Sequence, residues 1–197
     1  MTHANLAPMV DAEPIEPERI RPLRRAEYDK LVELGAFGDE RLELLRGVLV
    51  EMSPAGTRHA HGASWISDLM YRLLGERALV RCQCPFGAAD DSEPEPDVAV
   101  VPRRVYLDDH PTTAHLVVEV ADTSLRKDRG VKRELYAGAG VPEYWIVNLV
   151  HEVVEIHRVP VDGRYTEAAR LGRGDRLRLV DFPDVEVAVA DLLPPAH

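Results

Sequence analysis

Two short apolar runs, rich in β-branched residues, constrain the fold of this chain most strongly. The first is Val98–Val101 and the second is Leu116–Val120. Their lengths and their valine content are typical of buried strands. Each run carries an acidic residue where a strand interior seldom has one, because Asp97 precedes the first run and Glu119 interrupts the second. A buried carboxylate is costly unless it is paired or binds a metal ion. Two such acids on neighbouring strands, followed by a lysine, predict a divalent-cation site suited to phosphodiester chemistry.

Each acidic residue also has a structural reading when it is taken alone. An aspartate that follows proline at the start of a strand, as Asp97 follows Pro96, is often a turn or cap residue. A glutamate between valines, such as Glu119, can lie on an edge strand or pair with an arginine. The stretch between the two acids is long enough for two strands and a surface loop. If the strands are neighbours, both carboxylates converge at one end of a sheet, and this combination favours a site.

The rest of the chain alternates segments of helical periodicity with segments of strand periodicity. This alternation predicts an α/β fold with a mixed central sheet flanked by helices. An additional N-terminal β-hairpin is expected at residues 42–45 and 48–52, because Arg46 and Gly47 separate two short apolar runs. Helices are expected at residues 24–34, 58–75 and 129–138. Further strands are expected at residues 79–86, 143–147 and 153–157, near Tyr165, and at residues 177–180 and 185–189.

Individual residues refine the two later helices. Thr57 is predicted to cap the first of them with its side chain, and Trp65 is predicted to belong to its apolar stripe. Ser124 or Asp128 is predicted to cap the second helix, which places Lys127 in the loop before it.

The length of 197 residues and the apolar content of 45% predict one soluble domain. We expect this domain to span residues 21–193, after a flexible arm at residues 1–20 that is rich in proline and acidic residues. No apolar run approaches the roughly 20 residues that span a bilayer, and the N-terminus lacks a signal pattern. A cytoplasmic protein that does not contact the membrane is therefore expected.

The formal net charge of −10 counts against non-specific binding of nucleic acid, but it is compatible with a local basic groove. The strongest basic cluster directly follows the two acids and holds two of the three lysines, Lys127 and Lys132. In an arginine-rich chain, a lysine is favoured where a compact ammonium group is needed. The alternative is a solvated helix face. Contacts to nucleic acid are predicted at Arg126, Lys127, Arg129 and Arg133.

A zinc site is an alternative use of the histidines and cysteines. His59, His61, Cys82 and Cys84 are ligand types that zinc prefers. Their spacings, H-x-H and C-x-C, are shorter than those of usual zinc sites. The two cysteines are therefore interpreted as residues on one face of the strand predicted at residues 79–86.

Several segments, in their order and spacing, resemble the Uma-type family of restriction endonucleases, within the PD-(D/E)XK nuclease superfamily. The resemblance extends over roughly residues 20–193 and implies a restriction-endonuclease-like core. The matching segments are Glu43–Gly47, Met52–Pro54 with His59, Glu95–Val98, Val118–Val120, Asp128–Lys132 with Tyr136, and Gly140–Ile146.

The superfamily places its aspartate and its glutamate on adjacent strands, and the matching positions are Asp97 and Glu119. A lysine is expected two residues after the glutamate, where this chain has Ala121. In the family that the chain resembles, a lysine from the following helix takes over. The position that matches is Lys132, and Lys127 is the alternative.

Three further residues are accessory candidates. The superfamily's additional acid on its first core helix has no clear match in this chain. Glu43 on the hairpin and His59 near the start of a helix are the candidates for its role. Tyr136 shares a helix face with Lys132, so it can either donate a hydrogen bond to the site or belong to the core.

The resemblance implies a metal-dependent endonuclease that hydrolyses phosphodiester bonds of nucleic acid, with DNA as the expected substrate. Asp97 and Glu119 would bind Mg²⁺ or Mn²⁺, and Lys132 would orient the water or neutralise the phosphate. The assembly that we consider for this protein is a homodimer. The alternative, favoured by the acidic net charge and the displaced lysine, is a nuclease-fold protein with weak or no catalysis that acts as a nucleic-acid-binding or regulatory module.

Overall fold

The computed structural model describes residues 21–195, so the arm predicted at residues 1–20 lies outside the described residues. Its centre is a six-stranded sheet in the order β3-β4-β5-β6-β7-β8. β5 and β6 are parallel, and every other neighbouring pair is antiparallel. The predicted mixed sheet is thereby confirmed. Its strands are β3 (Leu79–Cys82), β4 (Val98–Val101), β5 (Leu116–Ala121), β6 (Glu143–Asn148), β7 (Val153–Val161) and β8 (Arg164–Leu171).

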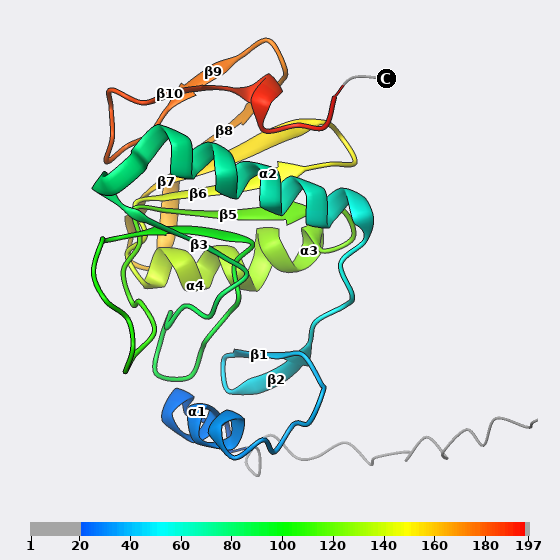
Figure 1. Ribbon diagram of the computed structural model, residues 1–197, viewed down its shortest axis with the longest axis vertical. Helices are drawn as coiled ribbons and strands as arrows, with labels where there is room; N and C mark the ends of the chain where they lie inside the picture. Colours follow the sequence, from blue (N-terminus) through cyan, green and yellow to red (C-terminus); the bar gives the residue numbers. More distant parts are fainter. Residues whose placement is uncertain (1–20, 196–197) are drawn as a thin grey trace, which may run out of the picture.

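Helices cover both faces of this sheet (Figure 1). One long helix, α2, lies on one face, and the helical segment between β5 and β6 lies on the other. The predicted N-terminal hairpin is also present, beside the first helix. No helix within residues 21–195 combines the length and the apolar character needed to cross a bilayer. The elements outside the sheet are α1 (Arg25–Glu33), β1 (Leu42–Leu45), β2 (Val48–Glu51), α2 (Thr57–Leu74), η2 (Gly75–Arg77), α3 (Leu125–Lys127), η3 (Asp128–Lys132), α4 (Arg133–Gly138), β9 (Arg176–Arg178), β10 (Glu186–Ala188) and η4 (Val189–Asp191).

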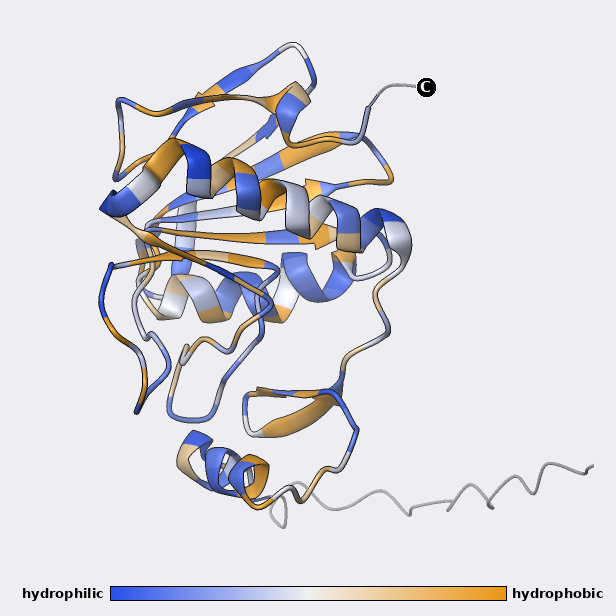
Figure 2. Cartoon of the chain, in the orientation of Figure 1, coloured by the Kyte–Doolittle hydropathy of each residue, from blue (hydrophilic) through white to orange (hydrophobic). Residues whose placement is uncertain are grey.

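Two apolar cores lie on the two faces of the sheet, because successive strand residues point to opposite faces. Val98 and Val118 pack against Ile66 of α2. Val117, one residue before Val118, packs on the other side with Leu135 of α4. Figure 2 shows the apolar character of the central strands and the alternation of polar and apolar residues along α2. Burial on both faces explains why β4 and β5 are nearly continuous apolar runs.

Two boundaries around the site differ from the prediction. β3 ends at Cys82, because Gln83 adopts a φ of 48°, which a strand does not accommodate. Cys84 therefore lies beyond the strand, and the two cysteines do not share a strand face. The helical segment before β6 begins at Leu125, earlier than predicted, so Lys127 lies in α3 and not in a loop.

The predicted caps and the predicted apolar stripe of α2 also need correction. Thr57 is the first residue of α2 and does not cap it with its side chain. Trp65 is 45% exposed, and its indole N–H donates to the carbonyl of Asp191 (2.8 Å). Ser124 occupies the N-cap position of α3, but its hydroxyl oxygen accepts no hydrogen bond from a backbone N–H of the helix, and the hydroxyl donates to the carboxylate of Asp128. Local sequence signals do not reveal these longer-range partners.

Candidate active site

The candidate site lies where β4 begins and β5 ends. Their antiparallel register pairs Val98 with Val118. Continuing this register by one residue places Asp97 opposite Glu119, and directly opposite residues of antiparallel strands project to the same face. Both acids are buried. The pairing of the two strands, which the sequence left open, therefore brings the two predicted carboxylates together.

The carboxylate of Asp97 is held on one of its oxygens by donors from two directions. The Nε2 of His59, in the first turn of α2, lies 3.0 Å from Oδ2, and the backbone N–H of Val120 donates to the same oxygen (2.8 Å). Burial opposes the charge, but the hydrogen bond and the charge of His59 outweigh it and hold the pKa of Asp97 below its usual range. Within residues 21–195 the other oxygen, Oδ1, receives a single long contact of 3.5 Å, from Gln83. It is the oxygen that is free to bind a ligand.

The carboxylate of Glu119 is also anchored through one oxygen. The ammonium group of Lys132 (2.9 Å) and the hydroxyl of Tyr136 (2.7 Å) both donate to Oε1. Neither of these donors uses Oε2. Burial raises the pKa of Glu119 to about 8, although the charge of Lys132 opposes this effect. A cation at Oε2 would favour the ionised form and offset the cost of burial.

Glu43, on strand β1, connects the N-terminal hairpin to both lysines. Lys127 donates to its Oε1 (2.5 Å), and the ammonium group of Lys132 lies 3.3 Å from its Oε2. Burial of Glu43 opposes its charge, but the two ammonium groups lower its pKa. Burial likewise opposes the charge of Lys132, but Glu119 and Glu43 raise its pKa. Lys132 is therefore held as an ammonium ion between two carboxylates.

One buried acid of the site was not a candidate site residue in the sequence analysis, which treated it as a possible helix cap and as the first residue of a matching segment. Asp128 opens the π-type turn η3, and it is 1% exposed. The hydroxyl of Ser124 donates to its Oδ2 (2.5 Å). Burial raises the pKa of Asp128 against the opposing charge of Lys132. Turns of the π type occur frequently at functional sites, but such a turn has no signal in the sequence.

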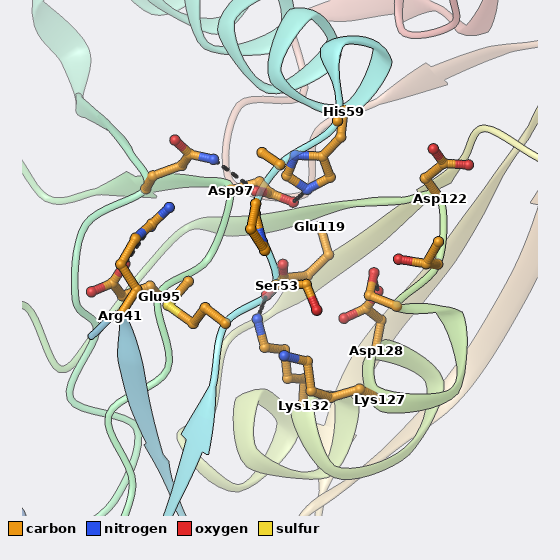
Figure 3. Close-up of a pocket in the computed structure, with 17 residues that line it drawn as sticks. Arg41, Ser53, His59, Glu95, Asp97, Glu119, Asp122, Lys127, Asp128 and Lys132 are labelled. Carbon is orange, nitrogen blue, oxygen red and sulfur yellow. Dashed lines mark hydrogen bonds and ion pairs between the residues drawn. The ribbon is translucent and has the colours of Figure 1, made fainter. Parts of the chain in front are cut away.

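Asp97, Glu119, Asp128 and the two lysines line one pocket of about 390 Å³, whereas Glu43 and Tyr136 lie behind its lining. Figure 3 shows that His59 and Asp97 enter it from the sheet and α2, whereas Lys127 and Lys132 enter from the opposite helical segment. Arg41 and the loop of residues 52–56 complete its wall. Within this pocket the carboxylates face two lysines.

The predicted nucleic-acid contacts do not gather at this pocket as a set. Lys127 lines it, but Arg126 is exposed outside its lining. Arg129 is paired with Glu155 of β7, with a donor–acceptor distance of 2.8 Å. Arg133 is half-buried and does not line the pocket either. The basic run therefore spreads around the helical segment.

The donor set of the pocket fits a hard divalent cation better than zinc. Both cysteines are free thiols. Within residues 21–195, no three His, Cys, Asp or Glu side chains are placed to hold a metal ion together. Mg²⁺ needs fewer protein ligands, because it keeps several waters and is commonly bound by one or two carboxylates plus phosphate oxygens. Asp97 and Glu119 supply this pair.

Comparison with known proteins gives a consistent result. Residues 25–190 match the family Uma2, described as "Putative restriction endonuclease". A crystal structure described as a "putative nuclease belonging to DUF820" from Anabaena variabilis superposes with a TM-score of 0.70. The superposition covers 87% of this chain and 97% of that one, at 15% sequence identity, and therefore supports the fold. The comparison with curated proteins gave no match.

Proposed function

The chain belongs to the Uma2 family of restriction-endonuclease-like proteins, and we propose that it is a metal-dependent endonuclease that hydrolyses phosphodiester bonds of DNA. The observation that carries this proposal is the convergence of Asp97, Glu119 and Lys132 in one buried pocket. Two carboxylates on adjacent strands beside an ammonium group form the minimal arrangement for metal-assisted phosphodiester hydrolysis. The family description favours DNA as the substrate.

In this proposal Asp97 and Glu119 hold Mg²⁺ or Mn²⁺ through the oxygens that their protein donors leave free. When bound, the cation polarises the scissile phosphate and lowers the pKa of the attacking water. His59 and Val120 orient Asp97, and Tyr136 orients Glu119. The protein thus fixes both carboxylates before the substrate arrives, which is the main contribution a scaffold makes to such a site.

The two lysines have different surroundings and therefore different proposed roles. Lys132 is buried between Glu119 and Glu43, so its ammonium group is positioned to neutralise charge that develops on the phosphate. The side chain of Lys127 is 30% exposed, and among the described residues its ammonium group pairs with Glu43 alone. It is suited to binding a flanking phosphate of the substrate.

A second candidate function is a nuclease-fold protein that binds nucleic acid with little or no catalysis. The observation that favours it is the placement of Lys132, whose ammonium group is shared by two carboxylates. The net charge of −10 favours it as well. In this case Asp97 and Glu119 would bind a cation without turnover.

A cleavage assay separates the two functions. Wild-type protein is incubated with mixed DNA and RNA substrates in Mg²⁺ or Mn²⁺, next to Asp97→Ala and to a chelator control. Endonuclease activity predicts cleavage of DNA by the wild type, loss with the chelator and loss in Asp97→Ala. Cleavage by both proteins would point to a contaminating nuclease. Binding of nucleic acid without cleavage under every metal condition would establish the second function.

A further inference from the structure

Asp128 presents an unsatisfied carboxylate oxygen in the same pocket as Asp97 and Glu119. Its Oδ1 is shielded by the protein and has no hydrogen-bond partner within residues 21–195. A buried polar atom without a partner is costly, and such atoms call for an explanation such as a bound water, an ion or a catalytic role. Structural roles usually satisfy both oxygens, so this one indicates a ligand.

The backbone around Asp128 is fixed independently of that oxygen. The N–H of Arg133 and the hydroxyl of Tyr144 (3.1 Å) both donate to the carbonyl of Asp128. The first of these bonds spans five residues and creates the π-type turn, in which Gly130 departs from helical angles with φ −102° and ψ −108°. These contacts fix the backbone of Asp128, and the hydrogen bond from Ser124 fixes Oδ2. The orientation of Oδ1 is therefore fixed as well.

Asp128 is directed toward the carboxylate of Glu119 (Figure 3). It does not join Asp97 and Glu119 in a group of three that could hold one metal ion within the described chain. Asp128 lines the same pocket as Asp97 and Glu119, so a water molecule held by Asp128 would lie beside a cation held by the other two acids. A carboxylate in this position can only accept hydrogen bonds when ionised, and water is the donor that the reaction requires.

We propose that Asp128 is a further catalytic residue, whose Oδ1 binds the attacking water and accepts its proton, with Ser124 as the residue that positions it. This inference rests on the proposed nuclease function. The water oxygen forms a bond to phosphorus as the bond from phosphorus to the leaving sugar oxygen breaks. One proton of the water passes to Oδ1 of Asp128, the leaving oxygen takes a proton from solvent, and Asp128 afterwards returns its proton to solvent.

The test measures two quantities on each variant: the single-turnover rate of DNA cleavage and the dissociation constant for Mn²⁺ by calorimetry. Asp128→Asn keeps the size of the side chain but cannot take the proton, so the rate should fall by about 100-fold or more. The dissociation constant for Mn²⁺ should stay within about threefold of wild type, because Asp128 is not a ligand. Ser124→Ala should reduce the rate by about 10-fold through loss of orientation.

Glu134→Gln is the matched control, since Glu134 lies in the same helical segment but pairs with Arg46 outside the pocket. It should cleave at the wild-type rate. Asp97→Asn is the reference for a lost metal ligand. A rate for Asp128→Asn within about threefold of wild type would overturn the inference, as would a loss of Mn²⁺ binding equal to that of Asp97→Asn.

Two further outcomes are informative. If Asp128→Asn does not fold, the single-turnover rate of Ser124→Ala becomes the test of the inference. A wild-type rate for that variant overturns it. If the wild type cleaves no substrate, the proposed function itself fails, and the role of Asp128 falls with it. Cleavage by the wild type together with an unaffected Asp128→Asn variant would remove only the role of Asp128.

Discussion

The ammonium group of Lys132 lies 2.9 Å from Oε1 of Glu119, and both side chains are buried. The two residues come from different elements, because Glu119 is on β5 and Lys132 ends the turn η3. The strand position two residues after Glu119 is occupied by Ala121. The ammonium group therefore comes from the helical segment on the other side of the pocket. A lysine at position 121 would have come from the same strand as Glu119.

Replacing Lys132 should impair both stability and catalysis. Lys132→Ala leaves Glu119 and Glu43 as buried acids without this ammonium group, and the loss of one partner from a buried ion pair typically costs about 3–5 kcal/mol. We expect cleavage to be suppressed, and the free energy of unfolding, measured by urea titration, to fall by this order. Lys132→Arg should not restore the rate fully, because a planar guanidinium does not replace a compact ammonium group.

Lys127→Ala is the comparison for that variant. The side chain of Lys127 is partly exposed, and within the described part of the chain its one ion pair is with Glu43, so a smaller loss of stability is expected, about 1 kcal/mol. It should weaken binding of DNA and reduce the salt dependence of that binding, while the single-turnover rate at saturating substrate stays high. An inactive Lys127→Ala beside a fully active Lys132→Ala would reverse the two assignments.

Glu43→Gln tests whether the hairpin organises the lysines. The amide retains a hydrogen-bond acceptor but removes the charge that holds Lys127 and Lys132. We expect a loss of about 10-fold in single-turnover rate and an unchanged affinity for Mn²⁺, since Glu43 is not a proposed ligand. Glu51→Gln on the exposed side of β2 is the control. Equal rates for both variants would show that the hairpin acid has no part in catalysis.

Glu119→Gln tests the metal site separately from the fold. The amide oxygen can still accept hydrogen bonds from Lys132 and Tyr136, so the thermal unfolding curve should remain cooperative. The affinity for Mn²⁺ in a calorimetric titration should fall by about 10-fold or more, because a charged hard ligand is lost. Cleavage should be lost with it. Unchanged Mn²⁺ binding would mean that Glu119 serves only as the partner of Lys132.

The stability of the protein should depend on pH through Glu93, an acid outside the catalytic pocket. Glu93 is 3% exposed, and burial, reinforced by Asp29, raises its pKa from 4.5 to about 7. Because the folded state holds this proton more tightly than the unfolded state, the contribution to stability is complete below about pH 4.5 and is lost as the pH rises through 7. We expect a loss of about 1–3 kcal/mol between about pH 5 and pH 8.5 from this group.

Urea denaturation at a series of pH values measures this contribution. Glu93→Gln should remove the fall in unfolding free energy, because the amide cannot ionise. Glu33→Gln, which changes an exposed acid of α1, is the matched control and should follow the wild-type curve. Parallel curves for Glu93→Gln and the wild type would show that Glu93 does not carry the pH dependence.

The sequence by itself determined the elements and two of the acids. Valine-rich runs at Val98–Val101 and Leu116–Val120 report burial directly, because strand length and side-chain alternation are local properties. An acid beside or within such a run is conspicuous for the same reason, so Asp97 and Glu119 were identified without any knowledge of pairing. The helical position of Lys132 followed from the sequence pattern, whereas its predicted role followed from the resemblance to a family.

Only the tertiary structure decided which side chains meet. Lys127 and Glu43 are 84 residues apart in the chain, and Asp97 reaches His59 across 38 residues. Contacts of this kind depend on strand register and on how the hairpin and α2 pack, which local propensities do not encode. The direction of Asp128 is a further case: a π-type turn, fixed by the hydroxyl of Tyr144 from β6, turns a residue with the signature of a helix cap into a pocket carboxylate.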